Sequence, residues 1–506
     1  MSIAKAVWCS TVLSSFLSSC PSVAAQELQG RLTYCNPISL PNYPIGRFAR
    51  DLHRGDTGPE WMWRLGYKQQ FRELADVTAL WFEGKFYLYP SVDMAWVSED
   101  LGATWTHHPL NVRDLGYAPT VVHHRDRFLL MASNSSIYAA KSPLGPFEEV
   151  GRIALKRDQT MPDFIDPMLF SDADLRLYYY WGCSPNGGIW GVELDANDVT
   201  KVVGTPKELI PFDPVQFPWE AVGQWNQNPR VGWMEGAWML KRGNSYYLTY
   251  NAGGTENRTY AMGAYLSDSP LGPFVPQKRN PILRSLEGLI TGTAHGSIIA
   301  GPNDELWAFY SVRASVVHAF ERRLGMDRAG IDANGELFVH DATSLPQRLP
   351  GQMPSGAKSN ALGWLPMNGE MRTIGSSQSP NLEGRFAVDN DLKTWWQPAE
   401  SDMSPTLTTE FMLPSTIYAA RIVWRDVGLD SRKGVVPGPI RYRIEIETSR
   451  DQWTTLIDRN QSTEDLLVDY RECGPTVGTR ARLIILGWPT GITPGVTELN
   501  LFGQTN

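Results

Sequence analysis

The stretch that decides the fold is Asp76–Ser91, which reads DVTALWFEGKFYLYPS. An acidic residue opens it, an apolar run follows, Glu83-Gly84 forms a polar turn, and an aromatic run closes it. Two short runs of β-branched and aromatic residues on either side of a glycine-containing turn are typical of a β-hairpin. The segment therefore predicts two antiparallel strands with a carboxylate at their entrance.

The same pattern returns four more times along the chain, in residues 118–133, 166–182, 235–250 and 295–311. The turn of each copy contains residues that tolerate turn geometry, such as Arg-Asp, Arg-Gly-Asn and Asn-Asp. The hexapeptide SPLGPF follows two of the copies at the same position, and Ser98–Trp105 resembles the Asp-box turn of propeller blades. Five ordered copies between about residues 70 and 345 predict a five-bladed β-propeller around a central channel.

The rest of the chain predicts a second all-β unit. Residues 346–365 are rich in proline, glycine and serine and indicate a linker. Residues 366–506 contain alternating strands such as Arg441–Ser449, which suit a β-sandwich of the jelly-roll type. We therefore expect an all-β protein with a propeller over residues 30–345 and a sandwich over residues 366–506.

The first 25 residues indicate a signal peptide, with Lys5, a modest apolar run and Ala24-Ala25 before the cleavage point. Leu17–Cys20 also resembles a lipobox, which would leave Cys20 as a lipid anchor. We expect a secreted, periplasmic or cell-surface protein without a membrane span, because no run is long and apolar enough. Three cysteines remain after the leader, at spacings that make neither a disulfide framework nor a metal motif.

Composition excludes one class of partner and suggests another. The net charge of -8 and the pI near 5.6 argue against nucleic acid, because no basic stripe is available to replace counterions. The 19 Trp and 19 Tyr suit a carbohydrate ligand, because aromatic faces stack on sugar rings. Packing of large β cores explains the same count equally well.

Three of the five repeats open on an acid, namely Asp76, Asp166 and Glu235. In a propeller the starts of the innermost strands converge on the axis, where unpaired carboxylates are costly unless they have a function. Glycosidic cleavage needs one acid to protonate the leaving oxygen and one carboxylate to activate water or attack carbon. The pattern therefore predicts a glycoside hydrolase that acts on oligo- or polysaccharide without an organic cofactor. A turn explains Asp76 or Asp166 singly, but it does not readily explain Glu235, which aromatic residues flank. A non-catalytic propeller lectin is the alternative of a different class.

Residues 30–345 resemble glycoside hydrolase family 43 through Ala75-Asp76, Ile165-Asp166-Pro167, Glu235-Gly236 and Thr293-Ala294-His295-Gly296. The resemblance implies that Asp76 is the general base, that Glu235 is the general acid, and that Asp166 modulates the pKa of the acid and orients substrate. It also implies an inverting mechanism. One departure is that Val77 follows Asp76 where the family usually has proline.

The same resemblance suggests further contacts with substrate. His295 matches an axial histidine that often lies over a water-coordinated calcium ion, although a buried core histidine is the equal alternative. Arg322 or Arg323 resembles an arginine that contacts substrate, and surface ion pairing is the alternative. Trp225 and Phe164 are candidate platforms for sugar rings.

The C-terminal unit resembles discoidin-type modules, including carbohydrate-binding module family 32, from residues 384–397 onward. This implies a structural calcium ion held by Asp389, Asp391, Thr394 and Glu498, whose oxygen donors suit Ca²⁺. The module either binds sugar or supports the propeller. For the whole chain we expect an exo-acting α-L-arabinofuranosidase, with β-D-galactofuranosidase and β-xylosidase as alternatives.

Overall fold

The computed structural model describes residues 32–45, 70–91, 93–113, 115–156, 161–314, 318, 320–340, 342–354, 357, 359–369 and 372–505. The predicted signal peptide and Cys20 lie outside these residues. In the described part, regular structure other than strands consists of short 3₁₀ turns at Pro218–Glu220, Pro302–Asp304, Gly384–Ala387 and Ser431–Lys433. Accordingly, none of the helices described there could cross a bilayer.

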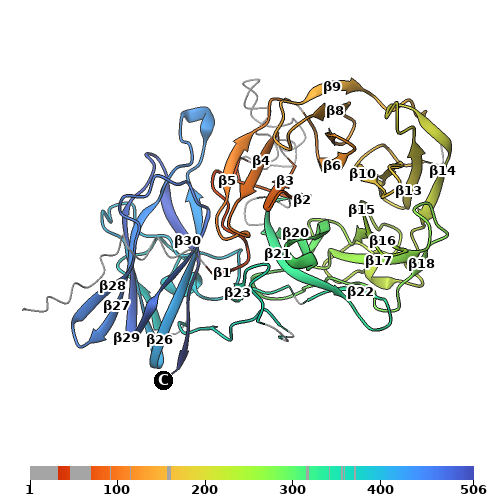
Figure 1. The fold of residues 1–506 in the computed structure, drawn as a ribbon. Coiled ribbons are helices and arrows are strands. Elements are labelled where there is room, and N and C mark those ends of the chain that lie inside the picture. Colours follow the sequence, from red (N-terminus) through yellow and green to blue (C-terminus); the bar gives the residue numbers. More distant parts are fainter. Residues whose placement is uncertain are drawn as a thin grey trace, which may run out of the picture.

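Five antiparallel sheets surround a common axis, which confirms the five-bladed propeller (Figure 1). The first three blades contain β2 (Thr78–Phe82), β3 (Lys85–Tyr89), β4 (Met94–Ser98) and β5 (Thr106–Pro109); β6 (Thr120–His124), β7 (Arg127–Met131), β8 (Ile137–Ala140) and β9 (Glu148–Gly151); and β10 (Met168–Ser171), β11 (Leu177–Trp181), β13 (Ile189–Leu194) and β14 (Val202–Ile210). The last two contain β12 (Cys183–Ser184), β15 (Met234–Arg242), β16 (Ser245–Ala252), β17 (Ala261–Ser267) and β18 (Val275–Pro276); and β19 (Ala294–Ala300), β20 (Leu306–Arg313), β21 (Arg322–Ile331) and β22 (Leu337–Val339).

The strands β2, β6, β10, β15 and β19 form the inner ring, and each contacts the next until β19 contacts β2. Each of the five repeats in the sequence is the hairpin that begins with one of these strands. The predicted Asp-box turn is also present, because Ser98 Oγ and Asp100 Oδ1 accept the backbone N–H groups of Gly102 and Thr104. The repeat pattern therefore locates every inner strand.

The C-terminal strands form a sandwich whose two layers share their longest strands. The strands are β24 (Leu365–Pro366), β25 (Thr373–Gly375), β26 (Thr406–Val427), β27 (Arg441–Ser449), β28 (Gln452–Asp458), β29 (Val468–Gly487) and β30 (Thr493–Thr505). A register shift between Glu410 and Ser415 divides β26, so that its first part lies with β25 and its second part pairs with β30. Such bulges let a strand pass from one layer to the other. Trp424, Ile444 and Leu483 from both layers are buried in one core.

The propeller and the sandwich pack against each other along several segments. β1 (Thr33–Tyr34) pairs with β23 (Gln347–Arg348), so part of the predicted linker is tied to the N-terminal segment between the two units (Figure 1). Arg72 forms ion pairs with Asp426 at 2.9 Å and with Asp465 at 2.5 Å. A single apolar cluster also contains buried side chains from both units. The two units therefore form a continuous core.

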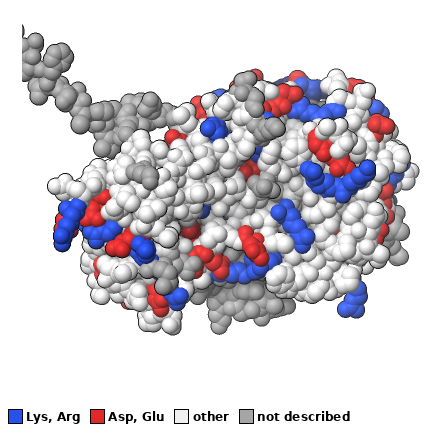
Figure 2. Space-filling view, turned by 90° about the horizontal axis from the view of Figure 1, so that it is seen from below, with Lys and Arg blue, Asp and Glu red and all other residues white. Residues whose placement is uncertain are grey.

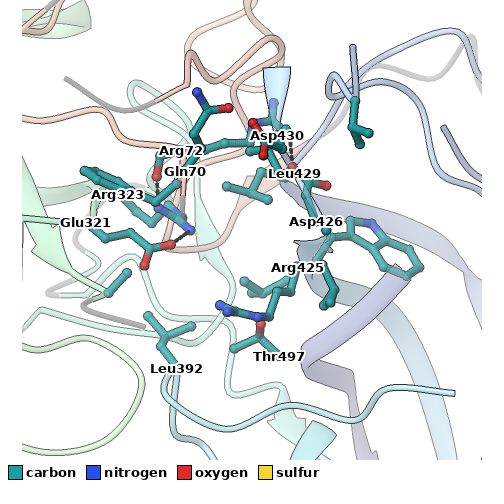
Figure 3. Close-up of a pocket in the computed structure, with 18 of the residues that line it drawn as sticks. Gln70, Arg72, Glu321, Arg323, Leu392, Arg425, Asp426, Leu429, Asp430 and Thr497 are labelled. Atoms are coloured by element: carbon teal, nitrogen blue, oxygen red, sulfur yellow. Dashed lines mark hydrogen bonds and ion pairs between the residues drawn. The ribbon is translucent and has the colours of Figure 1, made fainter. Parts of the chain in front are cut away.

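A cavity of about 310 Å³ lies at this junction (Figure 3). Arg72, Glu321 and Arg323 from the propeller face Arg425 and Asp426 from the sandwich across it. None of the three predicted catalytic acids lines the cavity. On the face shown in Figure 2, acidic and basic side chains occur in small mixed groups separated by wide uncharged areas. The described cysteines, Cys35, Cys183 and Cys473, are free thiols, which agrees with the expectation that disulfides do not hold the fold.

Candidate active site

The residues that open the inner strands share an unusual backbone conformation. Asp76, Ala118, Asp166 and His295 have φ between 46° and 53°, in the left-handed region that side chains other than glycine disfavour. Each such residue costs roughly 1–2 kcal/mol. Strained conformations of this kind persist where the surrounding structure enforces them, and they cluster at functional sites. The strain recurs here at one position of the repeat, next to the axis.

The fourth blade departs from the predicted alignment, in which Glu235 occupied the same repeat position as Asp76 and Asp166. The left-handed residue is instead Gly236, with φ of 58°, and Glu235 stands one residue earlier. The pairing of β15 with β16 shifts between Glu235 and Trp238, on either side of Gly236. A Cβ atom on Gly236 would lie 2.5 Å from Cδ2 of His295. Glycine is therefore needed there so that the histidine ring can reach the axis.

The three predicted acids meet around His295. Its Nδ1 lies 3.2 Å from Oδ1 of Asp76 and 3.9 Å from Oδ2 of Asp166. A carboxylate oxygen of Glu235 and one of Asp166 lie within 4.8 Å of each other and of Sγ of Cys183. All four axial side chains are buried, with exposed fractions of 6–9%. The sequence therefore located a real constellation, contributed by four different blades.

Asp76 is held in a strongly basic environment. Nη1 of Arg322 donates to its Oδ1 at 2.7 Å, and Nη2 donates to its Oδ2 at 3.2 Å. The Ser91 hydroxyl donates to Oδ2 at 2.7 Å. The same guanidinium contacts Oε1 of Glu73, and although burial lowers the pKa of Arg322, Asp76 and Glu73 raise it above its ordinary value. These donors stabilise the ionised form of Asp76, which is the form a general base requires.

Glu235 lies in the opposite electrostatic situation. Burial raises its pKa, while His295 and the hydrogen bond from the Tyr260 hydroxyl lower it in part, and the net shift is upward. Sγ of Cys183 donates to Oε2 of Glu235 at 3.2 Å. Burial, with the charges of Glu235 and Asp76, also raises the pKa of Asp166 to about 7. A carboxyl group that keeps its proton near neutral pH can act as a general acid.

His295 balances the charge of the three acids. Burial lowers its pKa, but the charges of Asp76, Asp166 and Glu235 outweigh burial, so the pKa is raised. Its backbone N–H donates to Oδ1 of Asn251 at 2.7 Å, which fixes the start of β19. The imidazole therefore lies buried among carboxylates that favour its protonated form, and an isolated core histidine does not describe it.

The predicted substrate-contacting residues take different positions. Arg322 points to Asp76, whereas Arg323 lies on the other face of β21 and pairs with Glu321 at 3.0 Å beside the interdomain cavity. Trp225 is 72% exposed, and the Arg258 guanidinium lies 5.1 Å from the centre of its ring. Phe164 is half-buried and packs edge-on against Trp181 at 5.6 Å, so core packing accounts for much of its surface.

Two groups of oxygen donors suit a cation. Around the axis these are the carboxylates near His295, which are the hard donors that Ca²⁺ prefers. In the sandwich, Thr394 Oγ1 donates to Asp389 Oδ2 at 2.7 Å, and Glu498 Oε2 accepts the N–H of Asn390 at 3.0 Å. The exposed Asp391 carboxylate accepts the N–H of Lys393 at 2.9 Å. The four predicted calcium ligands therefore lie in one loop region and its neighbouring strand β30.

Sequence reasoning missed Cys183 and Tyr260, which donate to Glu235. It also missed Ser91, which donates to Asp76, and Glu73, which shares the Arg322 guanidinium with Asp76. Cys183 reaches Glu235 because β12 leaves the third blade and pairs with β15 of the fourth. No sequence motif predicts that β12 pairs with the fourth blade. Tyr260 lies in a loop after β16, and Glu73 precedes the first repeat, so neither occupies a position that the repeat predicts.

The chain is similar to several known proteins. The β-D-galactofuranosidase of Aspergillus niger is 28% identical over 307 residues, which cover 53% of this chain and 83% of that protein. A β-xylosidase of Xylanibacter ruminicola is 25% identical over 286 residues, covering 45% of this chain and 83% of that protein. A solved glycoside hydrolase is similar with a TM-score of 0.47 and 18% identity, covering 85% of this chain and 97% of that one.

The family model "Glycosyl hydrolases family 43" matches residues 81–337, which is just over half of the 506 residues. The match extends from the first blade to the fifth and includes Asp166, Glu235 and His295. A propeller lectin without catalysis would not need the buried acids to meet, and here they do. The chain therefore belongs to glycosyl hydrolases family 43.

Proposed function

We propose that this glycoside hydrolase is an exo-acting, inverting enzyme that releases terminal furanose or pentose units, with α-L-arabinofuranosides as the first candidate substrates. The observation that carries the proposal is the contrast between two buried carboxyl groups near His295. Arg322 stabilises the ionised form of Asp76, and burial favours the protonated form of Glu235. A base and an acid with separated proton affinities are what hydrolysis with inversion requires.

In the proposed reaction Glu235 donates its proton to the glycosidic oxygen as the bond from that oxygen to the anomeric carbon breaks. Asp76 removes a proton from a water molecule, whose oxygen attacks the anomeric carbon from the opposite face. The products are the free sugar of inverted configuration and the alcohol of the leaving group, and a proton returns from Asp76 to Glu235 through solvent. Burial and then the charge of Asp76 raise the pKa of Glu235, and His295 lowers it in part. Asp166, whose own pKa the charge of Glu235 helps to raise, orients the substrate beside the acid.

The exo mode is supported by the position of the acids. Asp76, Asp166 and Glu235 are 6–9% exposed and lie where the inner strands begin, around the axis. Acids buried at the axis suit the end of a chain that enters between the blades better than the middle of a polymer that lies across them.

β-D-Galactofuranosidase is the second candidate activity. The match with this chain covers 83% of the length of the Aspergillus niger relative that carries this name. A galactofuranoside and an arabinofuranoside share the five-membered ring, and the galactofuranoside has one more exocyclic carbon. The β-xylosidase alternative is supported by the relative from Xylanibacter ruminicola.

The test is a screen with p-nitrophenyl α-L-arabinofuranoside, β-D-galactofuranoside and β-D-xyloside, followed by proton NMR of the first product formed. We expect hydrolysis of one of these glycosides and a first-formed sugar with the opposite anomeric configuration. Hydrolysis of none of them would contradict the proposed substrate class. A first product of retained configuration would contradict the roles of Asp76 and Glu235.

We further propose that the protein acts outside the cytoplasm, either secreted or anchored through Cys20, and that its sandwich holds a calcium ion. The leader sequence of residues 1–25 supports the first proposal. The short distances among Asp389, Thr394 and Glu498 and their neighbours support the second.

Removing Ca²⁺ with a chelator should lower the melting temperature of the protein, and Asp389→Asn should abolish the difference. An equal melting temperature with and without chelator would contradict the calcium site. Whether the sandwich also binds sugar is tested by affinity electrophoresis in arabinan and xylan.

A further inference from the structure

A second pocket, of about 170 Å³, lies where the last propeller blade meets the loop of residues 390–393 in the sandwich. Residues from both units line it, including Arg258, Thr291 and Arg313 from the propeller and Asn390 and Lys393 from the sandwich. Ala314 and Leu392 separate it from the cavity in Figure 3, because they line both. None of the proposed catalytic acids lines this pocket.

Three cations converge on the pocket, namely Arg258, Arg313 and Lys393. Burial lowers the pKa of Arg313 and the charge of Arg258 lowers it further, while the charge of Asp391 raises it in part. The like charges of Arg258 and Arg313 therefore oppose each other, and an anion in the pocket would relieve this repulsion.

Arg313 makes the strongest case for a missing ligand. Its side chain is 94% buried, since its exposed fraction is 6%, and its Nε has no hydrogen-bond partner among the described residues. Nε of Arg258 is likewise buried and without a partner there. Two acids, Glu287 and Asp391, also line the pocket, but both are exposed. None of the three cations forms an ion pair with a residue that the structure describes. A buried guanidinium nitrogen without a partner is costly, so its presence here points to a ligand.

The pocket adjoins the active site. Arg313 lies directly opposite Arg322 in the ladder between β20 and β21, so their side chains leave the same face of the blade. Arg322 donates both to Asp76 and to Thr255 Oγ1, and Thr255 is three residues before Arg258. Trp225 lies against Arg258 and leaves most of its ring exposed. A sugar next to the cleaved unit could therefore rest on Trp225 while its substituent enters the pocket.

We propose that this pocket is an anion subsite, formed by Arg258, Arg313 and Lys393, that receives the carboxylate or sulfate ester of an acidic sugar in the leaving group. This rests on the proposed exo-glycosidase function and narrows its substrate to the side chains of acidic polysaccharides. The guanidinium fork matches the oxygen pairs of both anions, and the lysine adds a point charge. The protein as a whole is acidic, so this local positive charge is specific to the pocket.

The test is isothermal titration of the full-length protein with methyl β-D-glucuronide, sodium sulfate and, as the neutral control, methyl β-D-glucoside. We expect one or both anions to bind, with an affinity that falls as chloride is added. Arg313→Gln should weaken binding by about tenfold or more, which corresponds to about 1.4 kcal/mol or more. Arg176→Gln, which removes an exposed guanidinium in the third blade, should bind as the original protein does.

The exposed Lys393 provides a second variant in case Arg313→Gln does not fold. Lys393→Gln should weaken anion binding several-fold with an unchanged melting temperature. Binding of the glucuronide alone assigns a carboxylate, binding of sulfate alone assigns a sulfate ester, and either supports the subsite. Absence of anion binding, or equal affinity in Lys393→Gln and the original protein, overturns it. These outcomes are independent of the aryl glycoside screen, whose failure would contradict the proposed function and leave the titration result in place.

Discussion

At the residue scale, burial and His295 have the largest effects on the pKa of Glu235, and two further contacts adjust it that no sequence motif predicts. The repeat pattern and the family resemblance located Asp76, Asp166, Glu235 and His295, because each stands at or next to the start of an inner strand. They could not locate Cys183 and Tyr260, which reach Glu235 from a short strand and a loop. The tuning of an acid depends on such neighbours, and the neighbours depend on tertiary structure.

Cys183 gives a test of this tuning. Its thiol donates to Oε2 of Glu235 and so lowers the pKa of that carboxyl group against the larger effect of burial. In Cys183→Ala the pKa of Glu235 should rise, because the ionised form loses a donor. The basic limb of the profile of kcat/KM against pH reports the acid in the free enzyme, so it should move to higher pH.

Cys473→Ala is the matched control, since Cys473 is also a half-buried free thiol but lies in the sandwich. Its pH profile should coincide with that of the original enzyme. A basic limb that stays in place in Cys183→Ala would show that the thiol does not tune the acid.

At the element scale, the sequence predicted the hairpins well because short aromatic runs and turn residues determine them locally. It misaligned the fourth blade, because the bulge at Gly236 depends on the ring of His295 arriving from the fifth blade. Contacts between blades leave no local pattern. The sequence therefore identified Glu235 correctly as an acid near the start of an inner strand, but its position in the repeat differs by one residue from the predicted one.

Gly236→Ala tests the importance of that bulge, and Gly243→Ala is its control. Both glycines have φ of 58°, but a Cβ on Gly236 would meet His295 at 2.5 Å, whereas one on Gly243 would meet no atom within 4 Å. Gly243→Ala should cost only backbone strain, roughly 1–2 kcal/mol of the free energy of unfolding. Gly236→Ala should cost about 1–3 kcal/mol more and lower kcat by about tenfold or more, because the ring of His295 must move.

These effects are measured by urea unfolding and by steady-state kinetics on the aryl glycoside selected in the screen. Equal stability and equal kcat for the two variants would contradict the role assigned to the close approach of Gly236 and His295.

At the scale of the whole molecule, the change in sequence pattern along the chain predicted the division into two all-β units. It did not predict how the two units pack against each other. The predicted linker contributes β23, which pairs with β1, and Arg72 joins the propeller to Asp426 and Asp465 of the sandwich. Composition distinguishes a linker from a repeat, but it does not show where the linker packs. The anion pocket arises at the same junction and was equally invisible in the sequence.

Arg72→Met should therefore destabilise the whole protein. Removing one member of a buried ion pair leaves its partners uncompensated and costs about 3–5 kcal/mol. We expect the single thermal transition of the original protein to occur at lower temperature in differential scanning calorimetry, or to split into two. Lys141→Met removes an exposed pair with Asp126 and should change little. An Arg72→Met protein as stable as the original would show that the junction does not couple the two units.

The most direct test of the central claim is the dependence of hydrolysis on the leaving group in Glu235→Gln and Asp76→Asn. Rates are compared for a dinitrophenyl glycoside and a phenyl glycoside. The dinitrophenolate leaving group departs without a proton, whereas the phenol leaving group needs one from the general acid. Glu235→Gln should lose about 10²–10⁴-fold in kcat/KM on the phenyl substrate and far less on the dinitrophenyl substrate, while Asp76→Asn should lose heavily on both. A Glu235→Gln enzyme that loses equally on both substrates, or that keeps full activity on the phenyl glycoside, would contradict the assignment of the acid.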